Sequence, residues 1–155
     1  MKKRIIAILV MVFILSVSVF LNELSRRPNT EIFVETLLSL PDFKDARKIE
    51  KLPETYQMAK EYGINEIIVY SVPNGTSTEF AVIEMEDKDA YKSSEKVVEV
   101  LEKRVSELKE AFSYSEIELR RLSDARIINS GKYVILAVYD SDRTAEKLIH
   151  SVLDR

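Results

Sequence analysis

The sequence predicts an α+β fold, in which an N-terminal transmembrane anchor helix precedes a two-layer domain with a mainly antiparallel four-stranded sheet packed on helices. Three observations predict it. An apolar run opens the chain, two pairs of β-branched and aromatic runs are each joined by turn residues, and a long segment of helical periodicity separates the pairs. Two hairpins that flank a long helix fit a sheet with helices packed against it.

The opening apolar run covers residues 5–21 and is the strongest signal in the chain. As a helix, these residues span about 26 Å, which is enough to cross a thin bilayer. Lys2, Lys3 and Arg4 precede the run without a neighbouring acid. The positive-inside bias therefore predicts a cytoplasmic tip at residues 1–4, a single-pass anchor in the cell membrane and an extracytoplasmic remainder.

A cleaved signal peptide is the alternative to this anchor, because Ser16 and Ser18 form a small-x-small pair. The apolar run is longer than the usual core of such peptides, which favours an uncleaved helix over secretion. Residues 22–29 are polar and contain a proline, so they predict a short tether. Residues 30–155 then form one domain.

The part of the chain after the anchor is acidic. Without the three N-terminal cations, the 23 basic residues of the chain fall to 20 against 26 acidic ones, a net charge of about −6. This sign repels phosphate backbones, so we expect no nucleic-acid partner. The chain has no cysteine, which excludes disulfides, thiolate zinc sites, a cysteine nucleophile and a lipid-modified cysteine.

Helix signals open the domain. Thr30 is the expected cap of a helix over residues 31–40, which ends at Pro41. A second helix is expected to start at Pro53 and to end at Gly63, because proline suits a first turn and glycine suits the position past a helix end.

The first hairpin is expected from residues 67–72 and 80–85. Both runs are rich in β-branched and aromatic residues, and Pro73, Asn74 and Gly75 between them are strong turn residues.

A long amphipathic helix is expected over residues 89–112. Its apolar face repeats every three or four residues, at Val97, Leu101, Val105, Leu108 and Phe112. Ser115 and Glu118 then have the spacing of a capping box, which predicts a shorter helix.

The second hairpin pairs residues 126–129 with residues 133–139 and turns at Ser130 and Gly131. Its second run is apolar on both faces, which indicates an interior strand. A final helix is indicated by an apolar stripe of Ala145, Leu148, Ile149, Val152 and Leu153.

Four stretches stand in a characteristic order: EYGINEIIVY (61–70), TEFAVIEM (78–85), VLEKRVSELKEAFSY (100–114) and NSGKYVILAVYD (129–140). Their landmarks are Tyr62-Gly63, Glu79, Phe112 with Tyr114, and Gly131 followed by Tyr133. In this order they resemble the bacterial domain of unknown function 4358, over roughly residues 50–153. The resemblance implies an exported, often lipid-anchored α+β protein of Gram-positive-type envelopes with no assigned activity. This chain lacks the cysteine of a lipid anchor and the proline that often follows the tyrosine at 114.

Glu79 is the residue that we single out as a candidate ligand or partner contact. On a strand it shares the more apolar face with Ala81, Ile83 and Met85, so we expect a half-buried carboxylate at the edge of the core. Such a group needs donors. The candidate donors are the hydroxyls of Tyr62, Tyr114 and Tyr133. The structural alternative is an edge carboxylate that bonds backbone amides or solvent.

Catalytic patterns are weak in this chain. Ser93 with Lys96 and Ser106 with Lys109 match Ser-x-x-Lys, the spacing of penicillin-recognising enzymes, but the pattern is common by chance and the chain is too short for that fold. His150 is the only histidine, which excludes a histidine-based metal cluster. We expect no catalytic residue, no metal and no cofactor.

Three functions follow from these observations. The first is a membrane-anchored extracytoplasmic accessory or interaction domain of the bacterial cell envelope, with an envelope protein as partner and no catalytic activity. The second is a ligand-binding or sensor domain for a cell-wall or small polar molecule, with Glu79 and nearby tyrosines in its cleft. The third and most remote is a Ser-x-x-Lys hydrolase.

Overall fold

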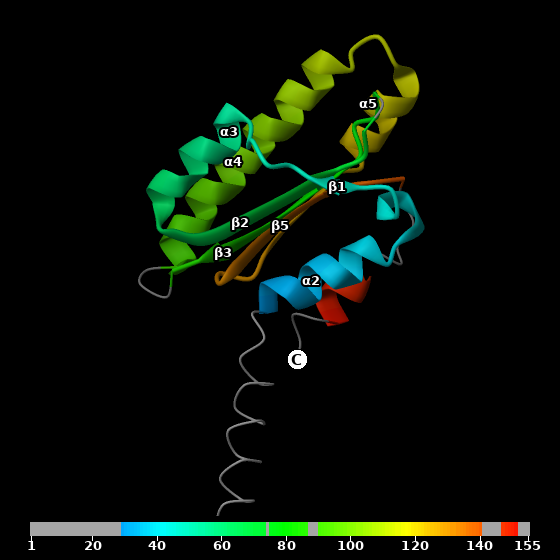
Figure 1. Ribbon diagram of the computed structural model, residues 1–155. Helices are drawn as coiled ribbons and strands as arrows, with labels where there is room; N and C mark the ends of the chain where they lie inside the picture. Colours follow the sequence, from blue (N-terminus) through cyan, green and yellow to red (C-terminus); the bar gives the residue numbers. More distant parts are fainter. Residues whose placement is uncertain (1–28, 74, 87–89, 141–146, 152–155) are drawn as a thin grey trace, which may run out of the picture.

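One antiparallel sheet of five strands forms the centre of the domain, with helices on both of its faces (Figure 1). This computed structural model describes residues 29–73, 75–86, 90–140 and 147–151. The strand order is β1-β2-β3-β5-β4. The elements are α2 (Asn29–Leu38), η1 (Pro41–Phe43), β1 (Arg47–Lys48), α3 (Glu54–Ala59), η2 (Lys60–Tyr62), β2 (Ile64–Ser71), β3 (Glu79–Met85), α4 (Ala90–Ala111), α5 (Glu116–Ser123), β4 (Arg126–Asn129) and β5 (Tyr133–Val138). Residues 147–151 are also helical.

The predicted anchor at residues 5–21 lies outside the described residues, as do the tip at residues 1–4 and nearly all of the tether at residues 22–29. Within the described part of the chain, no helix is both long and apolar enough to span a bilayer. The anchor therefore stays a prediction.

The α+β class and both hairpins are confirmed, but the sheet has five strands and not four. β2 pairs with β3, β4 pairs with β5, and the central pair of β3 and β5 joins the two hairpins. The additional strand, β1, adds two residues to the outer side of β2. Its sequence is Arg47-Lys48, which is short and charged and has none of the residues that favour strands.

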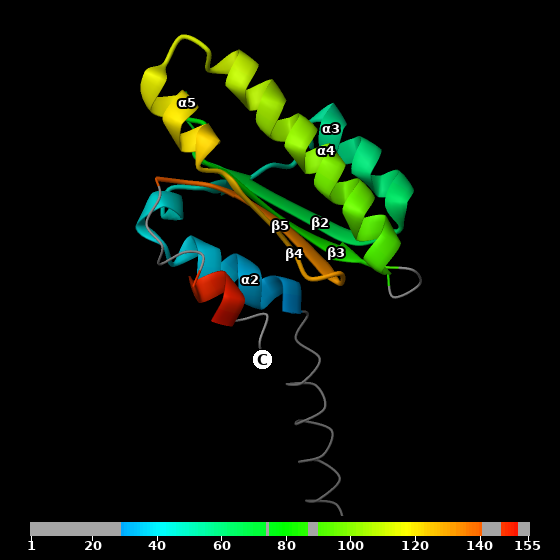
Figure 2. The ribbon, with the colours of Figure 1, turned by 180° about the vertical axis from the view of Figure 1, so that it is seen from behind.

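The predicted two-layer arrangement is wrong, because helices cover both faces of the sheet. Figure 2 shows α3, α4 and α5 on one face, and α2 with residues 147–151 on the other. Six of the seven residues of β3 and all six of β5 are buried. Strands that are apolar on both sides need cover on both sides, so these runs required a third layer.

Alternation along the central strands gives each face its own hydrophobic core. The core on the α2 side contains Phe33 and Leu37 of α2, Phe80 and Val82 of β3, and Tyr133 and Ile135 of β5. The core on the α4 side contains Val97 and Leu101 of α4, Ala81 and Ile83 of β3, and Val134 and Leu136 of β5. Residues one apart in sequence therefore face opposite layers.

Several predicted boundaries of the helices are confirmed. α4 begins and ends one residue inside the predicted range of 89–112, and the predicted apolar face of α4 packs into its core. The predicted helix over residues 53–63 is divided into α3 and η2. Gly63 ends it at φ 68°, the left-handed conformation that glycine adopts without steric cost.

One prediction about the flanking helices differs from the structure. Thr30 is not a cap, because α2 already begins at Asn29. The buried Thr30 hydroxyl instead donates to Oε2 of Glu84 on β3, at 3.2 Å. Near the end of the chain, Leu148 and Ile149 of the predicted apolar stripe pack against the α2-side core. Three further residues of that stripe lie outside the described residues: Ala145, Val152 and Leu153.

Candidate functional site

Glu79 is the first residue of β3, and its side chain points between the sheet and α4. Strand alternation places it on the face of Ala81 and Ile83, as predicted. The residue is 3% exposed, so it is buried in the layer and not half-buried at an edge. A carboxylate at this depth is costly unless donors surround it.

Two side chains from different helices supply those donors. The Tyr56 hydroxyl of α3 donates to Oε1 of Glu79 at 2.7 Å. Arg104 of α4 binds both oxygens, from Nε to Oε1 at 3.0 Å and from Nη2 to Oε2 at 2.8 Å. The guanidinium also lies 5.7 Å from the centre of the Tyr56 ring. The bidentate pair fixes α4 against the start of β3, and the Tyr56 bond fixes α3 there.

Arg104 was missed from the sequence, although the signal was present. Leu101, Arg104 and Leu108 follow the three- and four-residue spacing of one helical face, and both leucines are buried. A charged residue inside an apolar stripe needs a buried counter-charge. Glu79, the acid on the buried face of a central strand, was the available partner.

The environment of this cluster shifts the pKa of two of its members, Tyr56 and Arg104. Burial raises the pKa of Tyr56 well above its usual value, and the neighbouring Glu79 charge raises it further. Burial alone lowers the pKa of Arg104, but its hydrogen bonds to Glu79 outweigh burial and raise it. At pH 7 the Tyr56 phenol is therefore neutral and the Arg104 guanidinium is charged.

The three tyrosines expected beside Glu79 lie in three other places. Tyr62 is half-buried at the end of η2, and Tyr114 is 79% exposed between α4 and α5. Tyr133 is on the opposite face of the sheet, where its hydroxyl donates to Glu84 Oε1 at 3.4 Å. The expectation of a tyrosine donor was therefore right in residue type, but the donor is Tyr56.

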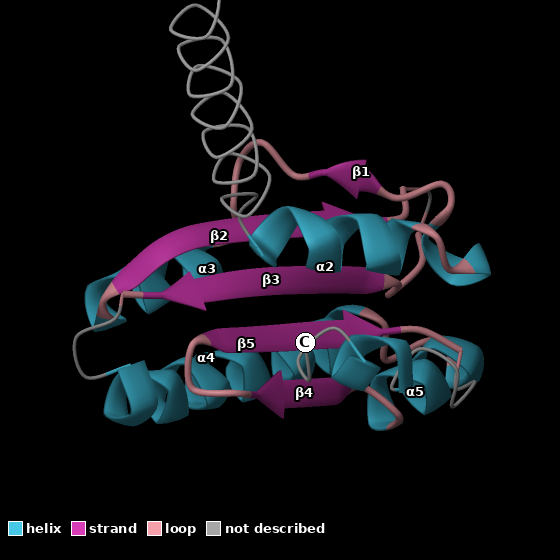
Figure 3. Ribbon diagram, turned by 90° about the horizontal axis from the view of Figure 1, so that it is seen from below, coloured by secondary structure: helices cyan, strands magenta, loops and turns pink. Residues whose placement is uncertain are grey.

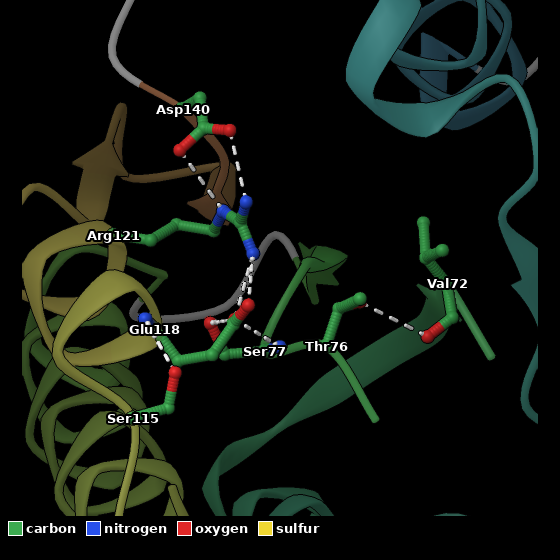
Figure 4. Close-up of polar contacts among 7 residues, drawn as sticks. All are labelled: Val72, Thr76, Ser77, Ser115, Glu118, Arg121 and Asp140. Carbon is green, nitrogen blue, oxygen red and sulfur yellow. Dashed lines mark hydrogen bonds and ion pairs between the residues drawn. The ribbon is translucent and has the colours of Figure 1, made fainter. Parts of the chain in front are cut away.

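A second buried carboxylate, Glu118 of α5, fixes the end of the first hairpin (Figure 4). Oε2 of Glu118 accepts from both the N–H and the hydroxyl of Ser77, each at 2.7 Å. Arg121 donates from Nη1 to both Glu118 oxygens, at 2.8 and 2.6 Å. The same guanidinium reaches Asp140 after β5, from Nη2 to Oδ2 at 2.9 Å. The cluster thus joins three segments that are distant in sequence.

Ser115 also serves α5 in Figure 4, where its hydroxyl oxygen accepts from the Glu118 N–H at 3.4 Å. The cap itself is confirmed. The Glu118 carboxylate does not complete a capping box, because it turns to Ser77. Burial raises the pKa of Glu118, but bonds from Ser77 and Arg121 outweigh burial and lower it. The bond from Arg121 also lowers the pKa of Asp140.

Two residues of the weak catalytic patterns, Ser106 and Lys96, have structural partners. The Ser106 hydroxyl donates to the backbone oxygen of Glu102 at 3.1 Å, and Lys96 pairs with Glu99 at 3.6 Å. His150 is exposed on the helical residues 147–151. Among the described residues, no group of three histidine, cysteine or acidic side chains is arranged to hold a metal ion.

A groove of about 600 Å³ lies between α2 and the outer strands of the sheet. It is lined by Glu31, Val34, Glu35 and Leu38 of α2, Lys48 of β1, and Glu66, Ile68 and Tyr70 of β2. A second groove, of about 520 Å³, lies near the start of β1 between Lys44 and Pro73. Glu79 is not among the described residues that line either groove, so the acidic groove on α2 is a separate candidate binding surface.

One family model matches the chain over residues 40–139, and its description is Domain of unknown function (DUF4358). The chain belongs to this family. The DUF4358 match runs from just before η1 to just after β5, and therefore contains the whole sheet and the α4-side helices. α2 and residues 147–151, which cover the other face, lie outside the matched range. No curated protein and no solved structure matches the chain.

Proposed function

We propose that this DUF4358 protein is a membrane-anchored extracytoplasmic interaction domain of the bacterial cell envelope, which docks on an envelope protein and catalyses no reaction of its own. The observation that carries the proposal is the apolar run of residues 5–21 behind Lys2, Lys3 and Arg4. Such a segment holds the acidic remainder on the outer side of the membrane.

The chemistry of the buried charges supports a role by contact. Glu79 and Glu118 each accept bonds from an arginine and from a hydroxyl, so their oxygens are occupied within the fold. A general base or nucleophile needs a lone pair that is directed at a substrate. These two carboxylates hold helices to strands instead.

The length of the tether favours a partner close to the membrane. Seven residues, 22–28, separate the apolar run from α2 and reach at most about 25 Å when extended. The amino-terminal end of α2 is then kept near the headgroups, together with the acidic groove beside it. Because the groove carries Glu31, Glu35 and Glu66, anionic lipid is an unfavourable occupant.

Crosslinking in intact cells tests the proposal. A membrane-impermeant, amine-reactive crosslinker should join the full-length chain to one specific envelope protein through its exposed lysines. The matched control keeps residues 1–29 and carries an unrelated exported domain in place of residues 30–155. This control chain should not give the crosslinked product. Absence of any specific product at good expression would contradict the proposal.

A catalytic role of the Ser-x-x-Lys type has its own test. We expect that a fluorescent penicillin leaves the full-length protein without a covalent label. A label that disappears in Ser106→Ala or Ser93→Ala would show an acylated serine and would contradict a purely non-catalytic domain.

A ligand-binding or sensor role is the second candidate, and the groove on α2 is the observation that favours it. Its volume of about 600 Å³ lies in the range of small-molecule sites. Isothermal titration calorimetry of the full-length chain with soluble cell-wall fragments distinguishes a sensor domain from an interaction domain. Saturable binding that Tyr70→Ala removes would favour the sensor.

A further inference from the structure

Most of the outer edge of β2 has no described strand beside it. β2 has eight residues, but β1 pairs only with Ser71 and Tyr70 at its carboxyl-terminal end. One further bond continues this ladder, from the Ile49 N–H to the Val69 oxygen at 2.8 Å. Figure 3 shows β1 beside only that end of the strand. Within the described residues, the remainder of β2 has β3 on one side and no strand on the other.

The free edge presents backbone groups in a defined direction. In an antiparallel ladder, alternate residues direct both their N–H and their C=O to the same edge. Because Val69 faces β1, Ile67 directs its N–H and C=O outward as well. The regular part of the edge begins at Glu66, since the pairing with β3 shifts between Ile64 and Glu66. An added strand therefore gains the two main-chain hydrogen bonds of Ile67, because the Val69 oxygen already accepts from Ile49.

The acidic groove continues this edge onto one face of the sheet. Glu66, Ile68 and Tyr70 alternate along β2 and line the groove, while Val34 and Leu38 form its opposite wall. The groove carries the carboxylates of Glu31, Glu35 and Glu66 against one lysine, Lys48. An extended segment on the edge of β2 would place every second side chain over these apolar and acidic residues.

We propose that the edge of β2 and the acidic groove together bind an extended segment of the partner protein, in which basic residues alternate with small apolar residues. Strand addition satisfies the free backbone groups, and cationic side chains match the groove carboxylates. A second copy of this chain is a poorer occupant, because two β2 edges side by side would bring their Glu66 carboxylates together. The inference rests on the proposed function, since it names the surface and the partner chemistry.

A peptide of the expected pattern tests this directly. The probe is acetyl-KVKVKVK-amide, added to the isotopically labelled full-length chain in zwitterionic micelles. We expect saturable changes in the backbone amide resonances of residues 66–69. The peptide EVEVEVE should cause none, and a KVKVKVK peptide with alternate backbone amides methylated should bind at least tenfold more weakly, because it loses the ladder bonds.

Charge-reversal variants provide the matched comparison. Glu35→Lys/Glu66→Lys should weaken KVKVKVK binding about tenfold, because two favourable charge pairs become repulsive. Glu95→Lys/Glu102→Lys, which makes the same net change with exposed residues of α4, should change the affinity less than twofold. Amide exchange of β3 and β5 should remain unchanged in both variants, which reports an intact fold.

Several results would overturn the inference. The first is that resonance changes are confined to elements other than β2. The second is that EVEVEVE or the methylated peptide binds as tightly as KVKVKVK. The third is that Glu95→Lys/Glu102→Lys on α4 lowers the affinity for KVKVKVK as much as Glu35→Lys/Glu66→Lys does. Dimerisation of the chain through β2 would also overturn it, since the occupant would then be a second copy. One pair of results would separate the docking surface from the interaction role. If KVKVKVK does not bind the parent chain, and the Glu35→Lys/Glu66→Lys variant is still crosslinked to the envelope protein in cells, the docking surface is wrong while the interaction role stands.

Discussion

Removal of Arg104 tests how the buried ion pair holds the α4 layer to the sheet. In Arg104→Met, the Glu79 side chain, 4% exposed in the fold, keeps only the bond from Tyr56 among the described residues. Loss of one member of a buried pair costs about 3–5 kcal/mol. The retained Tyr56 bond and the 15% exposure of the Arg104 side chain place the expected loss near the lower limit, at about 3 kcal/mol.

Replacing the whole cluster should be far less harmful than removing one member. In Glu79→Leu/Arg104→Met/Tyr56→Phe, no charge and no hydroxyl is left buried without a partner. Apolar replacement of a complete buried polar group is often near neutral, so we expect stability within about 1.5 kcal/mol of the parent chain. The cost in Arg104→Met therefore comes from the stranded carboxylate and not from lost packing.

Urea unfolding of the full-length chain in nonionic micelles, followed by circular dichroism, measures these differences. The seven tyrosines provide the near-ultraviolet signal, since the chain has no tryptophan. Lys103→Met is the matched control on an exposed position of α4 and should change stability by less than about 0.5 kcal/mol. A loss below about 1 kcal/mol in Arg104→Met would refute the reasoning, as would a triple variant less stable than Arg104→Met.

Three further outcomes follow. Because the pKa of Tyr56 is raised in the fold, folding opposes ionisation of its phenol, and the stability present below about pH 10 should fall as the pH rises further. Chemical denaturation at alkaline pH should show a smaller loss of stability in Tyr56→Phe than in the parent chain. The same alkaline slope in both chains would contradict this expectation. The pKa of Glu118 is lowered in the fold, so its contribution to folding stability is present above its ordinary pKa of 4.5 and is lost as the pH falls further. Arg121→Met should make stability depend less steeply on pH in this acid range. An identical acid slope in Arg121→Met and the parent chain would argue against the Arg121–Glu118 pair. Gly63→Ala should cost about 1 kcal/mol in the same urea titration, because alanine is strained at φ 68°, and a neutral effect would show that η2 can end differently.

The central elements of the fold followed from the sequence because local signals and tertiary pairing agree there. The hairpins had β-branched runs with turn residues between them, and α4 had an apolar face of helical period. β1 lacked such a signal, since Arg47 and Lys48 form a strand only because β2 offers them an edge. The third layer was inferable from residues 133–138, which are apolar on both faces, and from residues 80–85, in which Glu84 is the one charged residue.

The polar clusters were harder to predict because their members are distant in sequence. Glu79 was identified from alternation along its strand, but the donors Tyr56 and Arg104 come from two different helices. The pairing of Ser77 with Glu118 depends on how α5 folds back onto the first hairpin, a tertiary feature without local pattern. Arg104 was the exception, since its place in an apolar stripe already required a buried partner.

The orientation of the chain is tested most directly by cysteine labelling, because the native sequence contains no cysteine. Glu95→Cys places a thiol on an exposed position of α4, and Lys3→Cys places one in the predicted cytoplasmic tip. In intact cells, a membrane-impermeant maleimide should label Glu95→Cys, while Lys3→Cys should be labelled only after permeabilisation. Labelling of Glu95→Cys only after permeabilisation would contradict an extracytoplasmic domain and the interaction proposed for it.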